Sequence, residues 1–292
     1  MKILVTGSNG QLGYDVLKEL HRRKIPCRGI DREECDITNM PQVMHWVETY
    51  QPDAVIHCAA YTNVNRAETE QTLCMDINYR GSANIAAAAN KTGAKLIYIS
   101  TDYVFGASGE QPLGIYEAKN PLNTYGETKL SGENSTRILC PRSFIVRTSW
   151  VFGINGKNFI KTMLNVGKTH DTLKVVSDQV GTPTYTYDLA RLLVDMIETD
   201  KYGYYHVTNE GGYISWDDFT KEIFRQAVEL GHTEYSEDRL TVLPVTTAEY
   251  GLSKAKRPFN SRLDKSKLVK NGFTPLPTWQ DALRRYLKEI GM

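Results

Sequence analysis

The sequence predicts an α/β fold, a doubly wound parallel sheet with a smaller C-terminal lobe. Three observations predict it: short apolar runs that alternate with helical patterns in the first half, a glycine-rich turn after the first run, and a looser second half rich in Gly, Pro, Thr and Tyr. Apolar strands that alternate with helices indicate a parallel sheet covered on both faces. The carboxyl ends of such strands share one edge, where the ligands of these sheets bind.

The first half of the chain supplies the sheet. Apolar, β-rich runs predict its strands, and apolar residues at helical spacing predict the helices between them. The expected strands are residues 2–6, 27–30, 54–58, 96–100 and 144–147, and the expected helices are 11–23, 40–50, 66–91 and 124–139. We therefore assign residues 1–150 to a nucleotide-binding domain.

The second half, residues 151–292, is expected to form mainly a substrate-binding lobe. Its helical patterns cover residues 187–198, 216–230 and 278–290. Two further strand patterns lie near 174–177 and 204–207. We expect one or both of these strands, within about 174–207, to return to the main sheet.

Composition narrows the class of protein. The chain has 292 residues, and 35 Lys and Arg residues nearly balance 34 Asp and Glu residues, for a formal net charge of +1. This balance points to no nucleic-acid partner and no membrane surface. The five scattered cysteines show no metal-ligand spacing, which predicts reduced thiols and no metal site. No apolar run approaches the ~18 residues that a membrane span needs, and no signal-peptide segment is evident, so we expect a cytoplasmic protein.

The turn after the first strand carries a glycine at every third position and opens the first helix. Glycines there permit a tight turn and a close approach of the backbone to a pyrophosphate, which the positive end of the helix also attracts. This context predicts a Rossmann-type dinucleotide site. The turn residues expected to contact the cofactor are Gly7, Asn9, Gly10, Gln11, Leu12 and Gly13.

Two neighbouring residues give opposite indications about the cofactor. Asp31 ends the second strand, 18 residues after Gly13, where a carboxylate would accept hydrogen bonds from the adenosine ribose of NAD. Arg32 follows directly and could pair with the 2′-phosphate of NADP. Because a reductive step is expected, we favour NADPH, with NADH as the alternative.

A second cluster of residues predicts proton transfer. Tyr125 and Lys129 lie four positions apart, on one face of a helix. Reducing a ketone requires a proton on oxygen as hydride arrives at carbon, and a neighbouring ammonium is expected to lower the pKa of a tyrosine toward the working range. Thr101 follows the strand 96–100 at the active edge, where its hydroxyl can bond the same oxygen.

Further motifs extend these two sites along the whole chain. The glycine turn, Cys58-Ala59-Ala60-Tyr61, Ser100-Thr101-Asp102 and the Tyr125/Lys129 pair, in this order, resemble the extended short-chain dehydrogenase/reductases. More narrowly, the chain is similar to the dTDP-4-dehydrorhamnose reductases. The segments that carry this similarity are Asp36-Ile37-Thr38, Ala59-Ala60-Tyr61-Thr62, Arg66-Ala67-Glu68, Arg147–Phe152, Asp178–Thr184 and Arg257–Asp264.

The resemblance implies a reaction and roles for residues. The reaction is the NAD(P)H-dependent reduction of the C4 keto group of dTDP-4-dehydro-β-L-rhamnose to dTDP-β-L-rhamnose, the last step of dTDP-rhamnose biosynthesis. Thr101, Tyr125 and Lys129 would form the catalytic triad, with Tyr125 as proton donor, and Asn78 would brace the sheet beside the catalytic helix. The residues implied to line the cofactor are Asp36, Ile37, Ala59, Ala60, Tyr61, Thr62 and Ile99, with Tyr125 and Lys129. Those implied to contact the sugar are Thr101, Asp102, Tyr103 and Trp150.

Two assignments on the substrate side keep alternatives. Without the resemblance, Trp150 suits the core as well as it suits stacking on a substrate. The basic stretch 254–267 is typical of a solvated surface. An arginine within it, Arg257 above all, could instead grip the substrate diphosphate.

Other functions within the same superfamily remain open. The regulatory β subunit of methionine adenosyltransferase also resembles this family and acts as a binding partner, although an intact Thr101, Tyr125 and Lys129 set disfavours it. An epimerase would share the triad, whereas a dehydratase typically has Asp-Glu after the threonine, and here Asp102-Tyr103 follows. We expect a monomer or a homodimer and identify no carboxylate cluster for a bridging metal.

Overall fold

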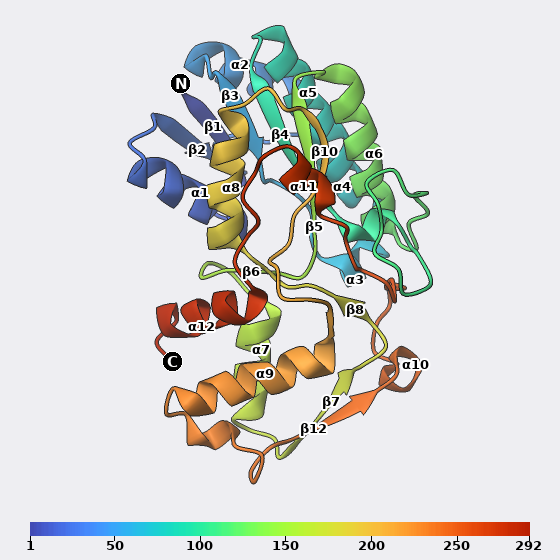
Figure 1. The fold of residues 1–292 in the computed structure, drawn as a ribbon. Helices are drawn as coiled ribbons and strands as arrows, with labels where there is room; N and C mark the ends of the chain where they lie inside the picture. The colour runs from blue at the N-terminus through green and yellow to red at the C-terminus, as the bar shows by residue number, and fades with distance from the viewer.

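A six-stranded parallel sheet forms the centre of the computed structural model, which describes residues 1–292 (Figure 1). The strand order is β10-β5-β4-β3-β1-β2, and every neighbouring pair is parallel. The predicted parallel sheet is confirmed. Its strands are β1 (Ile3–Thr6), β2 (Cys27–Ile30), β3 (Ala54–His57), β4 (Lys95–Thr101), β5 (Ser143–Thr148) and β10 (Gly203–His206).

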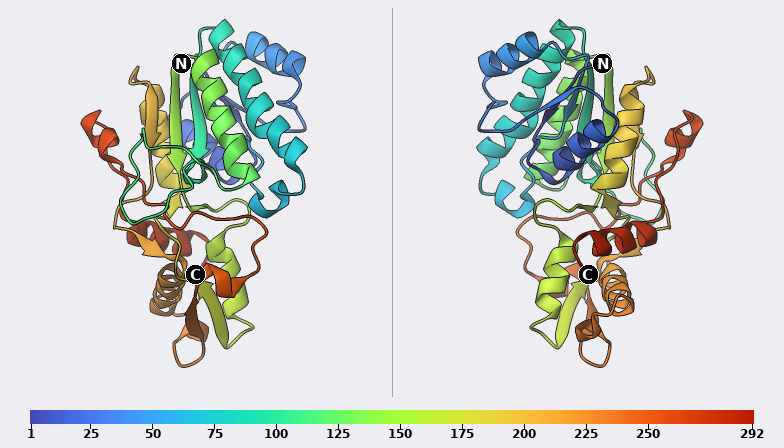
Figure 2. Two further views of the ribbon diagram at one scale, coloured as in Figure 1. Left: turned by 90° about the vertical axis from the view of Figure 1, so that its right-hand side faces the viewer. Right: turned by 90° about the vertical axis from the view of Figure 1, so that its left-hand side faces the viewer.

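Helices cover both faces of the sheet, which explains why its strands are apolar along nearly their whole length. One hydrophobic cluster joins the sheet to α1 (Gln11–Arg22) and α8 (Thr186–Ile197). A second cluster joins the other face to α2 (Met40–Tyr50) and α5 (Ser82–Lys91). The long helix α6 (Thr124–Leu139) lies beside α5 (Figure 2). These helices confirm the expected doubly wound arrangement.

The helix predicted over 66–91 is confirmed for residues 71–91 but is interrupted at residues 68–70. The chain forms α3 (Val64–Ala67), α4 (Gln71–Met75), a π-helical turn (Asp76–Gly81) and then α5. A contact with a distant segment lies at the interruption: Glu68, which follows α3, accepts from the Thr124 amide at 2.9 Å. Tertiary contacts of this kind can outweigh helix propensity. The π-helical turn carries Asn78, whose side chain bonds the backbone of Tyr61. Such turns are frequent at functional sites.

The second half builds most of a smaller lobe around its own hydrophobic cluster. Its main elements are α7 (Phe159–Gly167), α9 (Trp216–Glu229), α12 (Trp279–Glu289), β7 (Thr172–Val176) and β12 (Thr241–Val245). Short elements complete it: β6 (Val151–Phe152), β8 (Val180–Gly181), β9 (Thr184–Tyr185), β11 (Ile214–Ser215), α10 (Thr247–Tyr250) and a 3₁₀ turn at Thr233–Tyr235. Two other short elements lie with the main sheet: α11 (Ser266–Lys270), which packs beside β10, and a 3₁₀ turn at Asp102–Val104 after β4 (Figure 1).

Only one of the two strands expected to return to the main sheet does so. β10 pairs with β5, as predicted, whereas β7 pairs with β12 in a separate two-stranded sheet of the small lobe. The burial of β7 shows why, since Leu173 and Val175 are buried but Thr172 and Lys174 between them are exposed. A strand that alternates in this way suits a sheet covered on one face, not a sheet covered on both.

The fold places the carboxyl ends of β1, β3 and β4 against the small lobe, which lies below the sheet in Figures 1 and 2. The five cysteines are free. No helix combines the length and the apolar character required to cross a membrane.

Candidate active site

A cleft of about 1540 Å³ is lined by residues from the carboxyl edge of the sheet and from the small lobe. Every residue that the sequence predicted for the site lines it, from the glycine turn to Arg257. The structure thus brings together segments that span almost the whole chain. We call residues 7–13, 31–37 and 59–62 the cofactor wall. We call the side chains of Tyr103, Trp150, Phe159, Trp216 and Arg257 the substrate wall.

The glycine turn of the cofactor wall has no space for side chains. Gly7 has a φ of +66°, and a Cβ there would come within 2.6 Å of the Ala59 amide nitrogen. A Cβ on Gly13 would overlap the Gly7 carbonyl oxygen. No side chain caps the N-terminus of α1, so the amides of its first turn remain available to an anion. This turn fits the pyrophosphate of a dinucleotide.

Asp31 ties the end of β2 to the glycine turn. Its carboxylate accepts from the Asn9 amide at 2.9 Å and from the Arg32 amide at 2.8 Å. Arg32 is exposed at the cleft and its guanidinium forms no ion pair. The carboxylate that would favour NAD is thus engaged by the backbone, while the cation that would favour NADP is free to bind a phosphate.

Asn78 lies beside the catalytic helix α6, as expected, and supports the part of the cofactor wall that follows β3. Its Oδ1 accepts from the Tyr61 amide at 2.8 Å, and its Nδ2 donates to the Tyr61 carbonyl oxygen at 3.1 Å. The same Nδ2 lies 3.1 Å from the Thr128 hydroxyl on α6. One amide side chain therefore fixes the loop after β3 to the helix that carries Tyr125 and Lys129.

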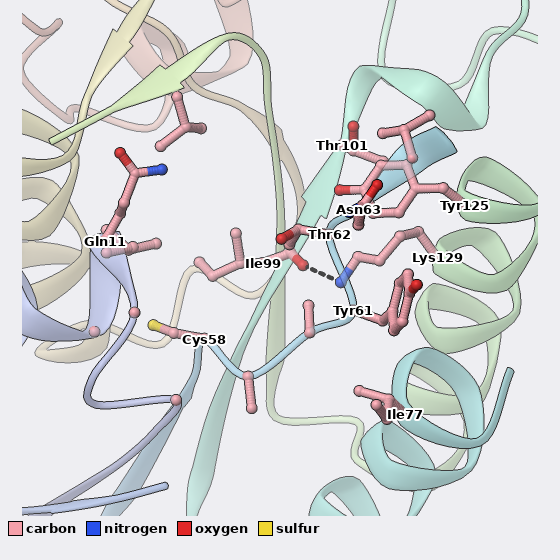
Figure 3. Close-up of a pocket in the computed structure, with 18 of the residues that line it drawn as sticks. Gln11, Cys58, Tyr61, Thr62, Asn63, Ile77, Ile99, Thr101, Tyr125 and Lys129 are labelled. Atoms are coloured by element: carbon pink, nitrogen blue, oxygen red, sulfur yellow. Dashed lines mark hydrogen bonds between the residues drawn. The ribbon is translucent and has the colours of Figure 1, made fainter. Parts of the chain in front are cut away.

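Thr101, Tyr125 and Lys129 meet at the middle of the cleft (Figure 3). Thr101 is the last residue of β4, and α6 begins one residue before Tyr125, with Asn123 capping it through the Gly126 amide at 2.8 Å. The Thr101 hydroxyl hydrogen-bonds to Tyr125 and donates to Asp102 Oδ1 at 2.9 Å. Of the three residues that the resemblance implies as a triad, Thr101 and Tyr125 are therefore in direct contact.

The expectation that the Lys129 ammonium lowers the pKa of Tyr125 is wrong for this structure. Burial raises the pKa of the Tyr125 phenol, and the hydrogen bond between Tyr125 and Thr101 opposes this only in part. Lys129 Nζ instead donates to the Ile99 carbonyl oxygen at 2.6 Å (Figure 3). It also lies 4.1 Å from the centroid of the Tyr98 ring. Burial lowers the pKa of Lys129 itself to about 7. Tyr125 is thus protonated at neutral pH, the state that a proton donor needs.

Tyr103 and Arg257 join the triad to a segment far along the chain. The Tyr103 ring stands edge-on to Tyr125 with centroids 5.5 Å apart, and its hydroxyl accepts from Arg257 Nη1 at 2.9 Å. Asp102, beside them, is 1% exposed, and burial raises its pKa to about 6. Within the basic stretch 254–267, only Arg257 lines the cleft.

Trp150 lies in the wall of the cleft and stacks on a second tryptophan. Its ring and that of Trp216 have centroids 3.7 Å apart and planes 15° apart. Trp150 adopts a φ of +50°, an uncommon conformation for a residue other than glycine, which here aims the indole at the cleft.

A family model described as the RmlD substrate binding domain matches residues 1–292. The chain belongs to this family. A dTDP-4-dehydrorhamnose reductase from Aggregatibacter actinomycetemcomitans is 39% identical over 291 residues, which cover 97% of each chain. The dTDP-4-dehydrorhamnose reductase of Clostridium acetobutylicum, solved by crystallography, is 42% identical over 100% of both chains with a TM-score of 0.93. That of Bacillus anthracis, solved in complex with NADP, is 41% identical over 99% of both chains with a TM-score of 0.91.

Some residues of this RmlD-family cleft were missed by the sequence reasoning. Lys157, Phe159, Trp216 and Phe219 line it from the small lobe. Phe159 and Trp216 each begin a helix, directly after the capping residues Asn158 and Ser215, and face one another at 4.4 Å between centroids. The position of an aromatic residue directly after a helix cap does not indicate in the sequence that it contacts a ligand. Only the packing of the small lobe shows that Phe159 and Trp216 lie together at the cleft.

No group of three or more His, Cys, Asp or Glu side chains in the structure could hold a metal ion.

Proposed function

We propose that this protein reduces the C4 keto group of dTDP-4-dehydro-β-L-rhamnose to give dTDP-β-L-rhamnose, using NADPH, in the last step of dTDP-rhamnose biosynthesis. The observation that carries the proposal is one cleft that holds a glycine turn fit for a dinucleotide opposite a protonated tyrosine in contact with Thr101. The named reductases that match over nearly the whole length support the choice of substrate.

Each residue of the triad has a task in this reaction. NADPH, when bound, supplies the hydride. Tyr125 donates its phenolic proton to the C4 oxygen, and Thr101 holds that oxygen beside the phenol through its hydroxyl. The Lys129 ammonium, which donates to the Ile99 carbonyl oxygen, would hold the ribose hydroxyls of the cofactor.

The substrate wall suits a nucleoside diphosphate sugar. Arg257 offers a guanidinium to the diphosphate, Asp102 and Tyr103 reach the sugar, and the Trp150 indole packs against it. NADPH is favoured over NADH by the free guanidinium of Arg32 and by the NADP bound to the relative from Bacillus anthracis.

We further propose that the two parts of the chain bind different ligands. Residues 1–150 bind the cofactor. From the second half, α8 and β10 pack into the main sheet and belong structurally to the same domain. The rest of 151–292 binds the substrate. The free cysteines support action in the cytoplasm, as a monomer or a homodimer.

The test is a turnover assay on the purified protein. We expect dTDP-4-dehydrorhamnose to oxidise NADPH, and NADH more slowly, as followed by loss of the reduced-nicotinamide absorbance, with NMR identifying dTDP-β-L-rhamnose as the product. Binding of both cofactors without oxidation would contradict the proposal and favour a regulatory binding protein. A product with the other configuration at C4 would contradict the stereochemistry.

A further inference from the structure

A fully buried ion pair lies directly behind the triad and has no part in the reaction described above. Arg147 on β5 is 0% exposed and Glu133 on α6 is 1% exposed. The guanidinium grips the carboxylate with two bonds, Nε to Oε1 and Nη2 to Oε2, each 2.7 Å long. Burying two charges costs desolvation free energy that their attraction repays only in part, so such pairs contribute little net stability. Its location must be explained by something other than stability.

The carboxylate of this pair also fixes the end of β4. Glu133 Oε1 accepts a 2.6 Å bond from the Ser100 hydroxyl. Ser100 stands between Ile99, whose carbonyl receives Lys129, and Thr101, whose hydroxyl contacts Tyr125. On the neighbouring strand, Arg147 is the register partner of Ser100. The Glu133 carboxylate thus links α6 to residues 99–101 of β4. These strand residues position the Lys129–Ile99 bond and the Thr101–Tyr125 contact.

The remaining contacts of Arg147 hold the pair itself in place. Nη1 donates to the Ile115 carbonyl oxygen at 2.9 Å, and the guanidinium lies 4.9 Å and 4.8 Å from the ring centroids of Phe105 and Tyr204. Burial lowers the pKa of the adjacent His206 to about 3, so this imidazole adds no second positive charge. The guanidinium therefore has a single position.

Glu133 is also a buried carboxylate that follows Lys129 by one helical turn on α6. The carboxylate raises the pKa of Lys129 against the burial that lowers it. Burial keeps the other groups that face Lys129 neutral: it lowers the pKa of the His57 imidazole and raises the pKa values of the thiols and phenols. These groups are His57, Cys58, Cys74, Tyr98 and Tyr125.

We infer that Glu133, held by Arg147, is a positioning residue with two effects: it fixes Ile99 and Thr101 through Ser100, and it serves as the counter-charge of the Lys129 ammonium. The inference rests on the proposed reductase function for its effect on turnover. Its effect on Lys129 is independent of any substrate.

Two variants separate the two effects. Ser100→Ala deletes the bond to β4 and keeps the charge of Glu133, whereas the double variant E133Q/R147M removes both buried charges without leaving one unpaired. The titration of Lys129 is followed by NMR of isotope-labelled lysine in the protein without ligands, with the Lys129 signal assigned by its loss in Lys129→Met. We expect Lys129 to titrate about one pH unit lower in E133Q/R147M than in the wild type, and at the wild-type pH in Ser100→Ala.

Turnover supplies the second measurement. Since Lys129 acts as an ammonium, activity is lost as the pH rises through its pKa, and the alkaline limb of kcat should move to lower pH in E133Q/R147M only. Ser100→Ala should lower kcat about tenfold to hundredfold with little change in KM. The matched control is D188N/R285M, which removes another ion pair with a buried carboxylate, far from the cleft, at 2.7 Å. It should lower Tm without moving the Lys129 titration or the pH limb.

Specific outcomes would overturn the inference. They are an unchanged Lys129 titration in E133Q/R147M, the same shift in D188N/R285M, or wild-type kcat in Ser100→Ala. Ser100→Ala keeps the inference falsifiable if the double variant does not fold. Wild-type protein that turns over no substrate would contradict the proposed function, whereas the NMR titration would still decide the role of Glu133 as counter-charge.

Discussion

On the cofactor wall the backbone carries the recognition, whereas on the substrate wall side chains carry it. Gly7, Gly10 and Gly13 allow close packing of the turn and leave the first amides of α1 available to a pyrophosphate, and all three lie within seven consecutive residues. The substrate wall collects Tyr103, Trp150, Phe159, Trp216 and Arg257 from five separate segments. The first wall depends on local conformation and the second on the docking of two lobes, so substitutions on the two walls should fail in different ways.

The largest effect is expected at the triad, where the two walls meet. Tyr125→Phe should lower kcat about 10²- to 10⁴-fold because it removes the proton donor. It should leave the Kd of NADPH nearly unchanged, since the cofactor wall stays intact. Steady-state kinetics and calorimetric titration would measure the two quantities.

Tyr103→Phe is the matched control for Tyr125→Phe. It loses the bond from Arg257 but no proton donor, so it should raise KM and leave most of kcat. Near-normal turnover in Tyr125→Phe would show that the proton comes from another group.

The next effect tests how strictly the cofactor wall depends on its backbone. Gly13→Ala places a Cβ against the Gly7 carbonyl oxygen, and the strain should lower stability by about 1–3 kcal/mol and raise the Kd of NADPH about tenfold or more. Alanine favours a helix interior over glycine by about 1 kcal/mol, and we expect the clash to outweigh this gain.

Gly114→Ala provides the comparison for Gly13→Ala. Its Cβ would meet nothing closer than the Glu117 carboxylate at 3.8 Å, so both Tm and Kd should stay at the wild-type values. Equal behaviour of the two variants would mean that the glycine turn tolerates side chains.

The contrast between the walls also explains what the sequence could predict. The strands, the glycine turn and the Tyr125/Lys129 pair are local patterns, and the structure places them as expected. The helix expected over 66–91 is interrupted at residues 68–70, where Glu68 bonds a segment distant in sequence. Hydrophobic periodicity records only which face of a segment is buried, not which partner buries it.

The same limit applies to the chemistry of the site. The spacing of Tyr125 and Lys129 predicts proximity, but not that Lys129 donates to Ile99 or that burial controls both pKa values. Trp216 and Phe159 were missed because aromatic residues after helix caps are as typical of a core as of a site. The site residues that the sequence analysis missed therefore lie mainly on the substrate wall.

A third effect sharpens the comparison, because it concerns a side chain on the cofactor wall. Arg32→Ala should weaken NADPH binding about tenfold, since a charged hydrogen bond to an exposed 2′-phosphate is lost, and should leave NADH binding unchanged. Arg28→Ala is the control: Arg28 lies over the Trp46 ring at 5.6 Å, outside the cleft, and should affect neither cofactor. A parallel loss of both cofactors in Arg32→Ala would assign Arg32 to the fold of the wall and not to the phosphate.

The smallest effect is expected from one aromatic side chain of the substrate wall. Trp216→Ala removes the partner that holds the Trp150 indole at 3.7 Å, and an aromatic pair contributes about 0.5–1.5 kcal/mol beyond its buried area. We therefore expect KM for the nucleotide sugar to rise about threefold to tenfold, with the Kd of NADPH unchanged, and Trp216→Phe to restore most of the loss. Trp216→Ala could instead weaken the binding of NADPH as much as that of the nucleotide sugar. The two walls would then be coupled through the small lobe, and they could not be treated as separate binding surfaces, one formed by backbone and one by side chains.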